Sequence, residues 1–269
     1  VPSGTEPHDW EPSPKDIPRM EQTDVFIYKG AGMEHWVSDV LAGLSNKKLI
    51  SVEASQGVSL LRSAEEEDGH DHEAAHADED EEDSHEHAHD HAHEHGEYDP
   101  HVWLDPMNAK QEMKNICEAF SEADPEHGAD YQANYEKWAK QIDKLDETYQ
   151  TTLENLSERN IVVAHEAYGY LCRRYNLTQV SIEGMSPDSE PDPGRMADII
   201  DFVRANNVRA IFFEELSGSR TAETVAAETG VKLLTLSPLE GLSDRQEETG
   251  GDYFSVMEEN LQQLTEASR

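Results

Sequence analysis

Two histidines of this chain lie in short loops whose composition would hold an imidazole in one orientation. His8 occurs in the segment EPHDWEP, and His101 occurs in DPHVWLDP. Prolines bound each loop and restrict its backbone, and a tryptophan (Trp10 or Trp103) follows two residues later, where its ring can pack against the loop. A neutral imidazole held in this way is a typical ligand of Zn²⁺. We therefore expect both histidines to bind a metal ion.

A third histidine occupies a different but equally suitable position. His165 directly follows the hydrophobic run IVVA and precedes Glu166. Ligands of parallel α/β sheets bind at the carboxyl ends of the strands, which is where such a residue would lie. This position alone does not show that His165 binds a metal ion, because a core histidine hydrogen-bonded to the backbone would occupy it equally well. The two loops described above favour the metal site.

Nine further histidines fall in a low-complexity segment, residues 64–98, composed almost wholly of Glu, Asp, His, Ala and Gly. Such a segment cannot bury enough apolar surface to offset its ordering entropy, so we expect a flexible surface loop. We interpret it as an auxiliary loop that holds several Zn²⁺ ions weakly; a solvated acidic insertion is the alternative. The alternating histidines that favour metal binding are His85, His87, His89, His91, His93 and His95. Two others, His35 and His127, lie among polar residues at helix ends and are expected to be solvated.

The segments around these histidines predict an α/β protein with two lobes. Before the low-complexity segment, residues 24–28 and 49–52 read as strands, and a helix through Trp36 lies between them. A further helix over 106–121 begins at an Asp-Pro start signal. After residue 160, short apolar strands alternate with helices, which predicts a parallel sheet covered on both faces. The expected strands are 161–164, 179–182, 210–213 and 232–236, and the expected helices are 166–175, 194–206, 220–229 and 253–265.

One long helix is predicted between the two groups of strands. Apolar residues recur at steps of three and four from Tyr131 to Leu156. At 1.5 Å per residue such a helix would reach roughly 40 Å, the width of a whole domain, so we interpret it as a spine. The predicted domains are therefore a first lobe over 1–128, a spine over 129–159 and a second lobe over 160–269.

The global composition narrows the classes of partner. With 58 acidic and 21 basic residues, the net charge is −37, which argues against nucleic acid or anionic lipid as a partner. The surplus suits cations and a salt-loving source organism. Only two cysteines occur, Cys117 and Cys172, and both are expected to be buried free thiols. We find no transmembrane run and no signal peptide after Val1, so we expect any targeting segment to lie upstream.

These segments, in this order, resemble the substrate-binding proteins of zinc and manganese ABC importers, in the cluster that has a spine helix. The resemblance covers essentially the whole chain, and the acidic-histidine insertion stands where zinc-type members carry one. It is carried by GTEPHDWEPS (4–13), DPHVWLDP (99–106), VAHEAYGY (163–170), IFFEE (211–215) and LSPL (236–239), with a weaker match in GGDYF (250–254).

The resemblance implies a single ion in the cleft between the lobes, held by His8 and His101 of the first lobe and His165 of the second. Manganese-type members carry a carboxylate where this chain has His165. Three imidazoles also favour Zn²⁺ over the harder Mn²⁺. The implied function is an extracytoplasmic protein, membrane-associated or lipid-anchored, that delivers Zn²⁺ to an ABC permease. We expect a monomer.

Three departures from the family pattern affect these expectations. Many relatives supply a fourth ligand from an Asp where this chain has Ser237, and some use a Glu where it has Pro7. The fourth position would then be filled by water or by Glu240, while Glu214 is expected to orient an imidazole rather than bind metal. In addition, Val1 aligns inside the first lobe, so two strands of that lobe are expected instead of four.

Three other functions fit part of this pattern. A hydrolytic zinc enzyme could use three histidines and a water, but the sequence has no HExxH motif and no nucleophile elbow, so we expect no enzyme. A manganese- or iron-binding homologue of the same transport class remains open. A surface zinc buffer or adhesin without a transport role would have the same fold. In every case, protonation of imidazole should weaken metal binding below about pH 6.

Overall fold

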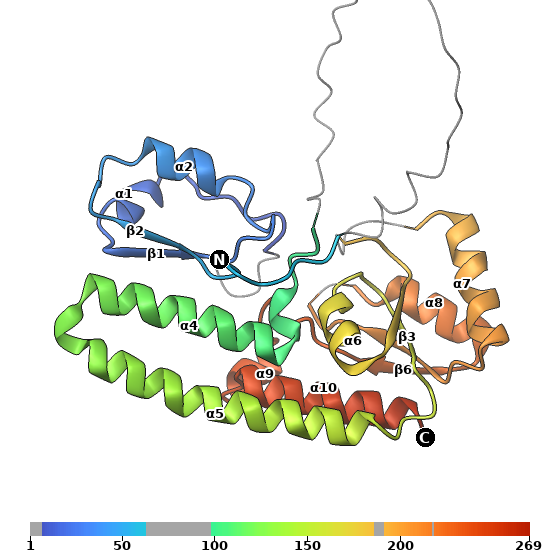
Figure 1. The fold of residues 1–269 in the computed structure, drawn as a ribbon. Coiled ribbons are helices and arrows are strands. Elements are labelled where there is room, and N and C mark those ends of the chain that lie inside the picture. The colour runs from blue at the N-terminus through green and yellow to red at the C-terminus, as the bar shows by residue number, and fades with distance from the viewer. Residues whose placement is uncertain (1–6, 63–97, 186–190, 217) are drawn as a thin grey trace, which may run out of the picture.

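The computed structural model describes residues 7–62, 98–185, 191–216 and 218–269. Within them, one parallel sheet precedes a long helix, α5 (Gly128–Leu153), and a second parallel sheet follows it along the chain (Figure 1). We call the part before α5 the first lobe and the part after it the second lobe. The predicted fold class, two helix-flanked parallel sheets joined by a spine helix, is confirmed.

The first lobe contains a two-stranded parallel sheet among its described residues, as predicted. Val25 pairs with Ile50 and Tyr28 with Glu53. Helix α2 lies on one side of this sheet and α4 on the other (Figure 1). The elements of this lobe are α1 (Ile17–Met20), β1 (Val25–Tyr28), α2 (Val37–Gly43), β2 (Ile50–Glu53), η1 (Val102–Leu104), α4 (Pro106–Ala123) and η2 (Pro125–His127). The short helix α1 was not predicted, because four residues are too few for a periodic pattern.

Helix α4 begins where the sequence predicts. The side chain of Asp105 accepts a hydrogen bond from the backbone N–H of Met107 at 2.8 Å, and Pro106 is the first helical residue. An acceptor at the N-cap satisfies a free backbone donor, and proline needs none at this position. The start of α4 is therefore fixed five residues after His101.

The spine helix α5 has 26 residues, which corresponds to about 39 Å. It lies antiparallel to α4 and beside α10 (Figure 1). The predicted boundary at residue 159 is wrong, since the helix ends at Leu153. A side chain caps the helix at this end: Arg159 Nη2 donates to the backbone carbonyl of Glu154, the C-cap residue, at 2.8 Å. After Glu154 the chain turns toward the second lobe.

The second lobe contains a four-stranded parallel sheet in the order β4-β3-β5-β6. Neighbouring residues of each strand face opposite sides, so Val162 and Ile211 pack against α7 and α8, while Val163 and Phe212 pack toward α5, α6 and α10. The elements are β3 (Asn160–Val163), α6 (Gly169–Tyr175), β4 (Thr178–Ser181), α7 (Pro193–Ala205), β5 (Ala210–Phe213), α8 (Arg220–Thr229), β6 (Lys232–Thr235), α9 (Asp244–Glu248) and α10 (Tyr253–Ala267).

Two helices of the second lobe differ from prediction. Helix α6 begins at Gly169 rather than at residue 166, because the preceding residues cross the strand ends: Glu166 N–H donates to the carbonyl of Gly184 and Tyr168 N–H donates to Gln179 Oε1. Helix α9 was not predicted, although Ser243 and Gln246 form a capping box at its start.

Other predictions concern the chain as a whole. Both cysteines are free and buried, as expected. Among the residues that the structure describes, no helix combines the length and apolar character needed to cross a bilayer. The predicted loop over 64–98 lies outside the described residues except for Tyr98, which forms an isolated antiparallel bridge with Arg62.

Candidate metal centre

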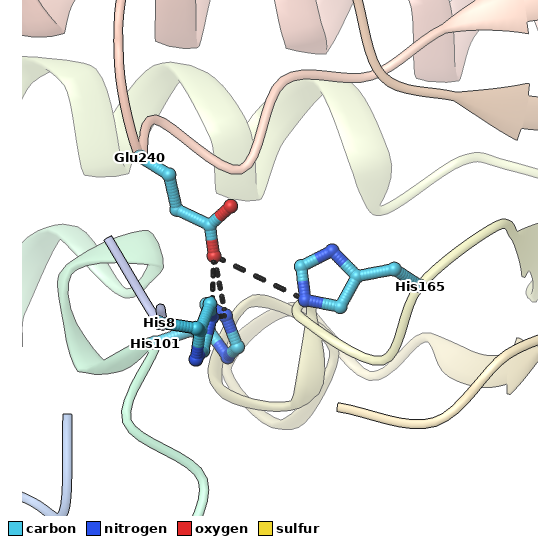
Figure 2. Close-up of side chains that lie close together, drawn as sticks. All are labelled: His8, His101, His165 and Glu240. Carbon is cyan, nitrogen blue, oxygen red and sulfur yellow. Dashed lines mark hydrogen bonds and ion pairs between the residues drawn. The ribbon is translucent and has the colours of Figure 1, made fainter. Parts of the chain in front are cut away.

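Four side chains from distant parts of the chain converge at the junction of the lobes. One ligand atom each from His8, His101, His165 and Glu240 lies within 4.8 Å of all the others. Figure 2 shows the three imidazoles around the carboxylate of Glu240. The carboxylate oxygen Oε1 is 3.0 Å from His8 Nε2, 2.7 Å from His101 Nε2 and 3.9 Å from His165 Nε2. The structure thus brings together all three histidines predicted from the sequence.

The loops predicted to hold the first two histidines are packed as their tryptophans suggest. The ring of Trp103 lies 5.4 Å from that of His101, measured between centroids. The Trp10 ring packs against Trp36, whose indole N–H donates to the Trp10 carbonyl at 3.0 Å. His101 is fully buried, since it directly precedes the buried turn η1. Aromatic packing therefore fixes both loops.

A carboxylate behind His101 fixes the orientation of its ring. Asp99 Oδ1 lies 2.7 Å from His101 Nδ1 and also accepts the backbone N–H of His101 at 2.9 Å. A ring whose Nδ1 faces a carboxylate directs Nε2 toward a metal ion. Asp99 was missed as a functional residue, although its position two residues before the histidine was a usable signal.

His165 is held in the same way, at the point where the second sheet reverses its strand order. His165 follows β3, and Glu214 follows the adjacent strand β5, so their side chains meet with Nδ1 and Oε1 at 2.7 Å. Ligand sites of open α/β sheets form at such a switch point. Glu214 orients this imidazole, which is the role expected from the sequence.

Glu240 reaches the centre from a tight turn after β6. Leu239 adopts a left-handed backbone conformation, with φ of 60°, which is unusual for a residue with a side chain. The turn is held from both lobes, because Trp103 Nε1 donates to the Pro238 carbonyl at 2.7 Å and Asn260 accepts the Ser237 N–H at 2.8 Å. The turn thus directs the Glu240 carboxylate toward the histidines.

Ser237, the other candidate fourth ligand, has a structural role in the turn that carries Glu240. Its hydroxyl accepts the backbone N–H of Leu239 at 3.2 Å and so contributes to the turn. Two further expectations hold for histidines outside the centre: His35 pairs with exposed Glu11, and His127 pairs with exposed Asp124. The predicted auxiliary ligands of the acidic loop lie outside the described residues: His85, His87, His89, His91, His93 and His95.

The electrostatics of the cluster follow from carboxylates packed against buried imidazoles. Burial lowers the pKa of His101, but hydrogen bonds from the ring to Asp99 and Glu240 outweigh it and raise the pKa to about 10. Burial likewise opposes a rise in the pKa of His165, which Glu214 produces. For Glu240, burial raises the pKa, and the neighbouring imidazoles lower it far below its usual range. The raised pKa values mean that the imidazoles of His101 and His165 favour protons at the positions where a metal ion would bind.

The donor set fits a divalent cation on one further ground. The Nε2 atom of His165 is buried and has no hydrogen-bond partner, and such an atom costs free energy unless a ligand satisfies it. It points toward Glu240 and the other imidazoles (Figure 2). Three imidazole nitrogens and one carboxylate oxygen within 4.8 Å of one another are a donor set of the kind that four-coordinate Zn²⁺ takes.

A model of a known protein family covers almost the whole chain. The family model described as "ZnuA: Zinc-uptake complex component A periplasmic" matches residues 1–267. That description is of a component of a transport complex and not of an enzyme.

Individual relatives cover nearly the whole chain. The zinc-binding protein AdcA of Streptococcus pyogenes serotype M3 is 38% identical over 262 residues, 97% of this chain and 50% of its own length. The high-affinity zinc uptake system protein ZnuA of Bacillus subtilis is 38% identical over 267 residues, 99% of this chain and 79% of that protein. The chain thus spans about half the length of the streptococcal relatives.

A solved structure shows the same fold. The Zn(II)-bound ZnuA-like domain of Streptococcus pneumoniae AdcA superposes with a TM-score of 0.78 at 32% identity, covering 99% of this chain and 88% of that domain. Both the long helix and the two helix-flanked parallel sheets are therefore shared features.

Proposed function

Because the chain belongs to the family of zinc-uptake complex component A, ZnuA, we propose that it binds one Zn²⁺ ion and delivers it to a membrane importer. The ligands are His8, His101, His165 and Glu240. The observation that carries this proposal is the convergence of these four side chains, with the Nε2 atom of His165 buried and lacking a hydrogen-bond partner.

The chemistry of the four donors favours Zn²⁺ over the other metals of the same transport class. Three imidazole nitrogens suit a borderline cation, whereas Mn²⁺ prefers oxygen donors. A tetrahedral zinc site with bonds of about 2.1 Å places its donor atoms about 3.4 Å apart. The distances from Glu240 Oε1 to the three Nε2 atoms, 2.7 to 3.9 Å, bracket that value.

The remaining partners follow from this role. The protein acts outside the cell membrane, anchored to it or associated with it, as a monomer that passes the ion to an ABC permease. The family's description as the periplasmic component of an uptake complex supports this placement. A surface zinc buffer would use the same site, so transport is decided by zinc-limited growth of a deletion strain, restored by the gene only if the protein serves an importer.

Substitution of a ligand tests the site. In metal-stripped protein, His165→Ala removes one of three imidazoles and should raise the Kd for Zn²⁺ at least about a hundredfold, as measured by competition with a chromophoric chelator. The chelator keeps weakly bound zinc, such as any on the acidic loop, out of the measurement. A matched control is His127→Ala, which removes an exposed histidine far from the cluster. Equal zinc affinity in the two variants would refute the proposed site.

A further inference from the structure

Tyr170 makes a contact between the lobes that the proposed function does not use. It lies in α6 of the second lobe and is fully buried. Its hydroxyl accepts the backbone N–H of Leu61 at 2.9 Å and donates to the backbone carbonyl of Asp99 at 2.8 Å. Both of those residues belong to the first lobe, and Asp99 N–H also donates to the Leu61 carbonyl at 2.9 Å. One hydroxyl therefore joins α6 to two adjacent backbone segments of the other lobe.

The residue before Tyr170 fits against the side chain of Asp99. A Cβ atom placed on Gly169 would lie 2.7 Å from Asp99 Oδ2 and 3.3 Å from Leu61 Cδ1. Real side chains do not approach this closely, so only glycine allows Asp99 to stay where it is. Helix α6 thus holds Asp99 both by its backbone carbonyl and by the position of its carboxylate.

Asp99 in turn determines how His101 is presented. Its other oxygen, Oδ1, lies within hydrogen-bond distance of His101 Nδ1 and accepts the backbone N–H of the same residue. A shift of Asp99 would therefore rotate or displace the imidazole that carries Nε2 into the metal centre. This contact chain runs from the second lobe to a ligand of the first.

We propose that Tyr170, together with Gly169, is a positioning residue that sets the orientation of His101 through Asp99. The inference rests on the proposed function. It adds that α6 of the second lobe sets the orientation of His101, a ligand from the first lobe. The affinity for Zn²⁺ then depends on the position of α6 as well as on the ligands themselves.

Two tyrosine variants separate positioning from simple stability. Tyr170→Phe keeps the ring and removes the hydroxyl that holds Asp99. Tyr149→Phe is the matched control, because Tyr149 is also fully buried and its hydroxyl also donates to a backbone carbonyl, that of Met257 in α10. Both variants should lower the melting temperature of the zinc-free protein. Only Tyr170→Phe should raise the Kd for Zn²⁺, by about tenfold, and change the visible absorption spectrum of the Co²⁺-substituted protein.

A second variant and a double-mutant cycle test whether Tyr170 acts on His101 through Asp99. Gly169→Ala should displace the Asp99 carboxylate and give the same tenfold change, and it carries the test if Tyr170→Phe does not fold. In an Asp99→Asn background, Tyr170→Phe should have little further effect on Kd, since the two act on one path. An unchanged Kd and Co²⁺ spectrum in Tyr170→Phe, or an equal change in Tyr149→Phe, would overturn the inference. A His101→Ala variant with normal zinc affinity would instead overturn the proposed function.

Discussion

At the scale of single residues, the centre consists of pairs rather than isolated ligands. His101 faces Asp99, and His165 faces Glu214, each across an Nδ1-to-oxygen distance of 2.7 Å. A carboxylate at one ring nitrogen increases the basicity of the other, which favours both metal and proton binding. A proton and a metal ion therefore compete for the same ring nitrogens.

This competition extends to higher pH than an isolated imidazole would imply. With its pKa raised to about 10, His101 carries a proton at pH 7 in the metal-free protein, so bound Zn²⁺ must displace it. Apparent zinc affinity should fall up to tenfold for each unit of pH below 10 for this proton alone. Calorimetric titration at pH 7 in two buffers of different ionisation enthalpy should detect proton release. Identical heats in both buffers would contradict the prediction.

The sequence identifies the histidines of the cluster better than it identifies the residues that hold them in place. His8 and His101 are identifiable because prolines and a tryptophan surround them, and His165 because it follows a strand. Asp99 was missed although it lies only two residues before His101, because that spacing suggests a contact with the ring but does not specify which ring nitrogen the carboxylate faces. Glu240 could only be proposed beside Ser237, because the left-handed turn at Leu239 that selects Glu240 has no glycine to indicate it.

At the scale of elements, a charged network joins the spine to both ligand-bearing segments. Arg174 of α6 donates to Asp146 of α5 through two hydrogen bonds, at 2.7 and 2.6 Å, and lies 3.3 Å from Asp105, the N-cap of α4. The Tyr175 hydroxyl also donates to Asp146, at 2.9 Å. Three helices are thus fixed to one another close to the centre.

Removal of the arginine should destabilise the protein. Arg174→Gln leaves two largely buried carboxylates facing each other, so the free energy of unfolding should fall by about 2 kcal/mol, measured by urea denaturation of the zinc-free protein. The matched control is Arg245→Gln, which breaks a similar two-bond pair with Glu259, but one in which both side chains are far more exposed. Its cost should stay below about 1 kcal/mol. Equal losses in the two variants would contradict this assignment.

The elements themselves were predictable where burial follows a simple period. The six strands of the described residues were predicted to within one residue at each end, because apolar or β-branched residues cluster in each of them between turn signals. The spine shows the limit of the same reasoning. Its apolar stripe continues through Trp138, which is 36% exposed, because a pattern reports which face is apolar and not whether another element covers it.

At the scale of the whole molecule, one hydrophobic core runs through both lobes. It includes Met33 and Leu104 of the first lobe, Tyr149 of the spine, and Tyr168 and Phe212 of the second lobe. Opening the lobes widely would expose this shared core, at a cost of about 25 cal/mol for each Å² of apolar surface. We therefore expect small tilts and loop rearrangements on release of the ion, rather than a wide hinge motion.

The acidic-histidine segment can be tested separately from this core. Arg62 and Tyr98 form a bridge, so residues 64–97 can be deleted and the gap closed with a short linker. Deletion should lower the number of zinc ions bound at saturation, because nine histidines are removed, while the single tight site should keep its affinity. Equilibrium dialysis measures the first quantity, and chelator competition measures the second. An unchanged total would show that the segment has no metal-binding role.

The strand order of the second sheet has a consequence for how the centre tolerates change. His165 and Glu214 are 49 positions apart in the chain, yet β3 and β5 are direct neighbours, with Val163 opposite Phe212. That ladder brings the two strand ends side by side. Outside α6, whose Gly169 and Tyr170 contact Asp99, changes of length in the connections between the two strands can therefore accumulate without moving either side chain, which leaves evolution and protein engineering free to remodel those connections.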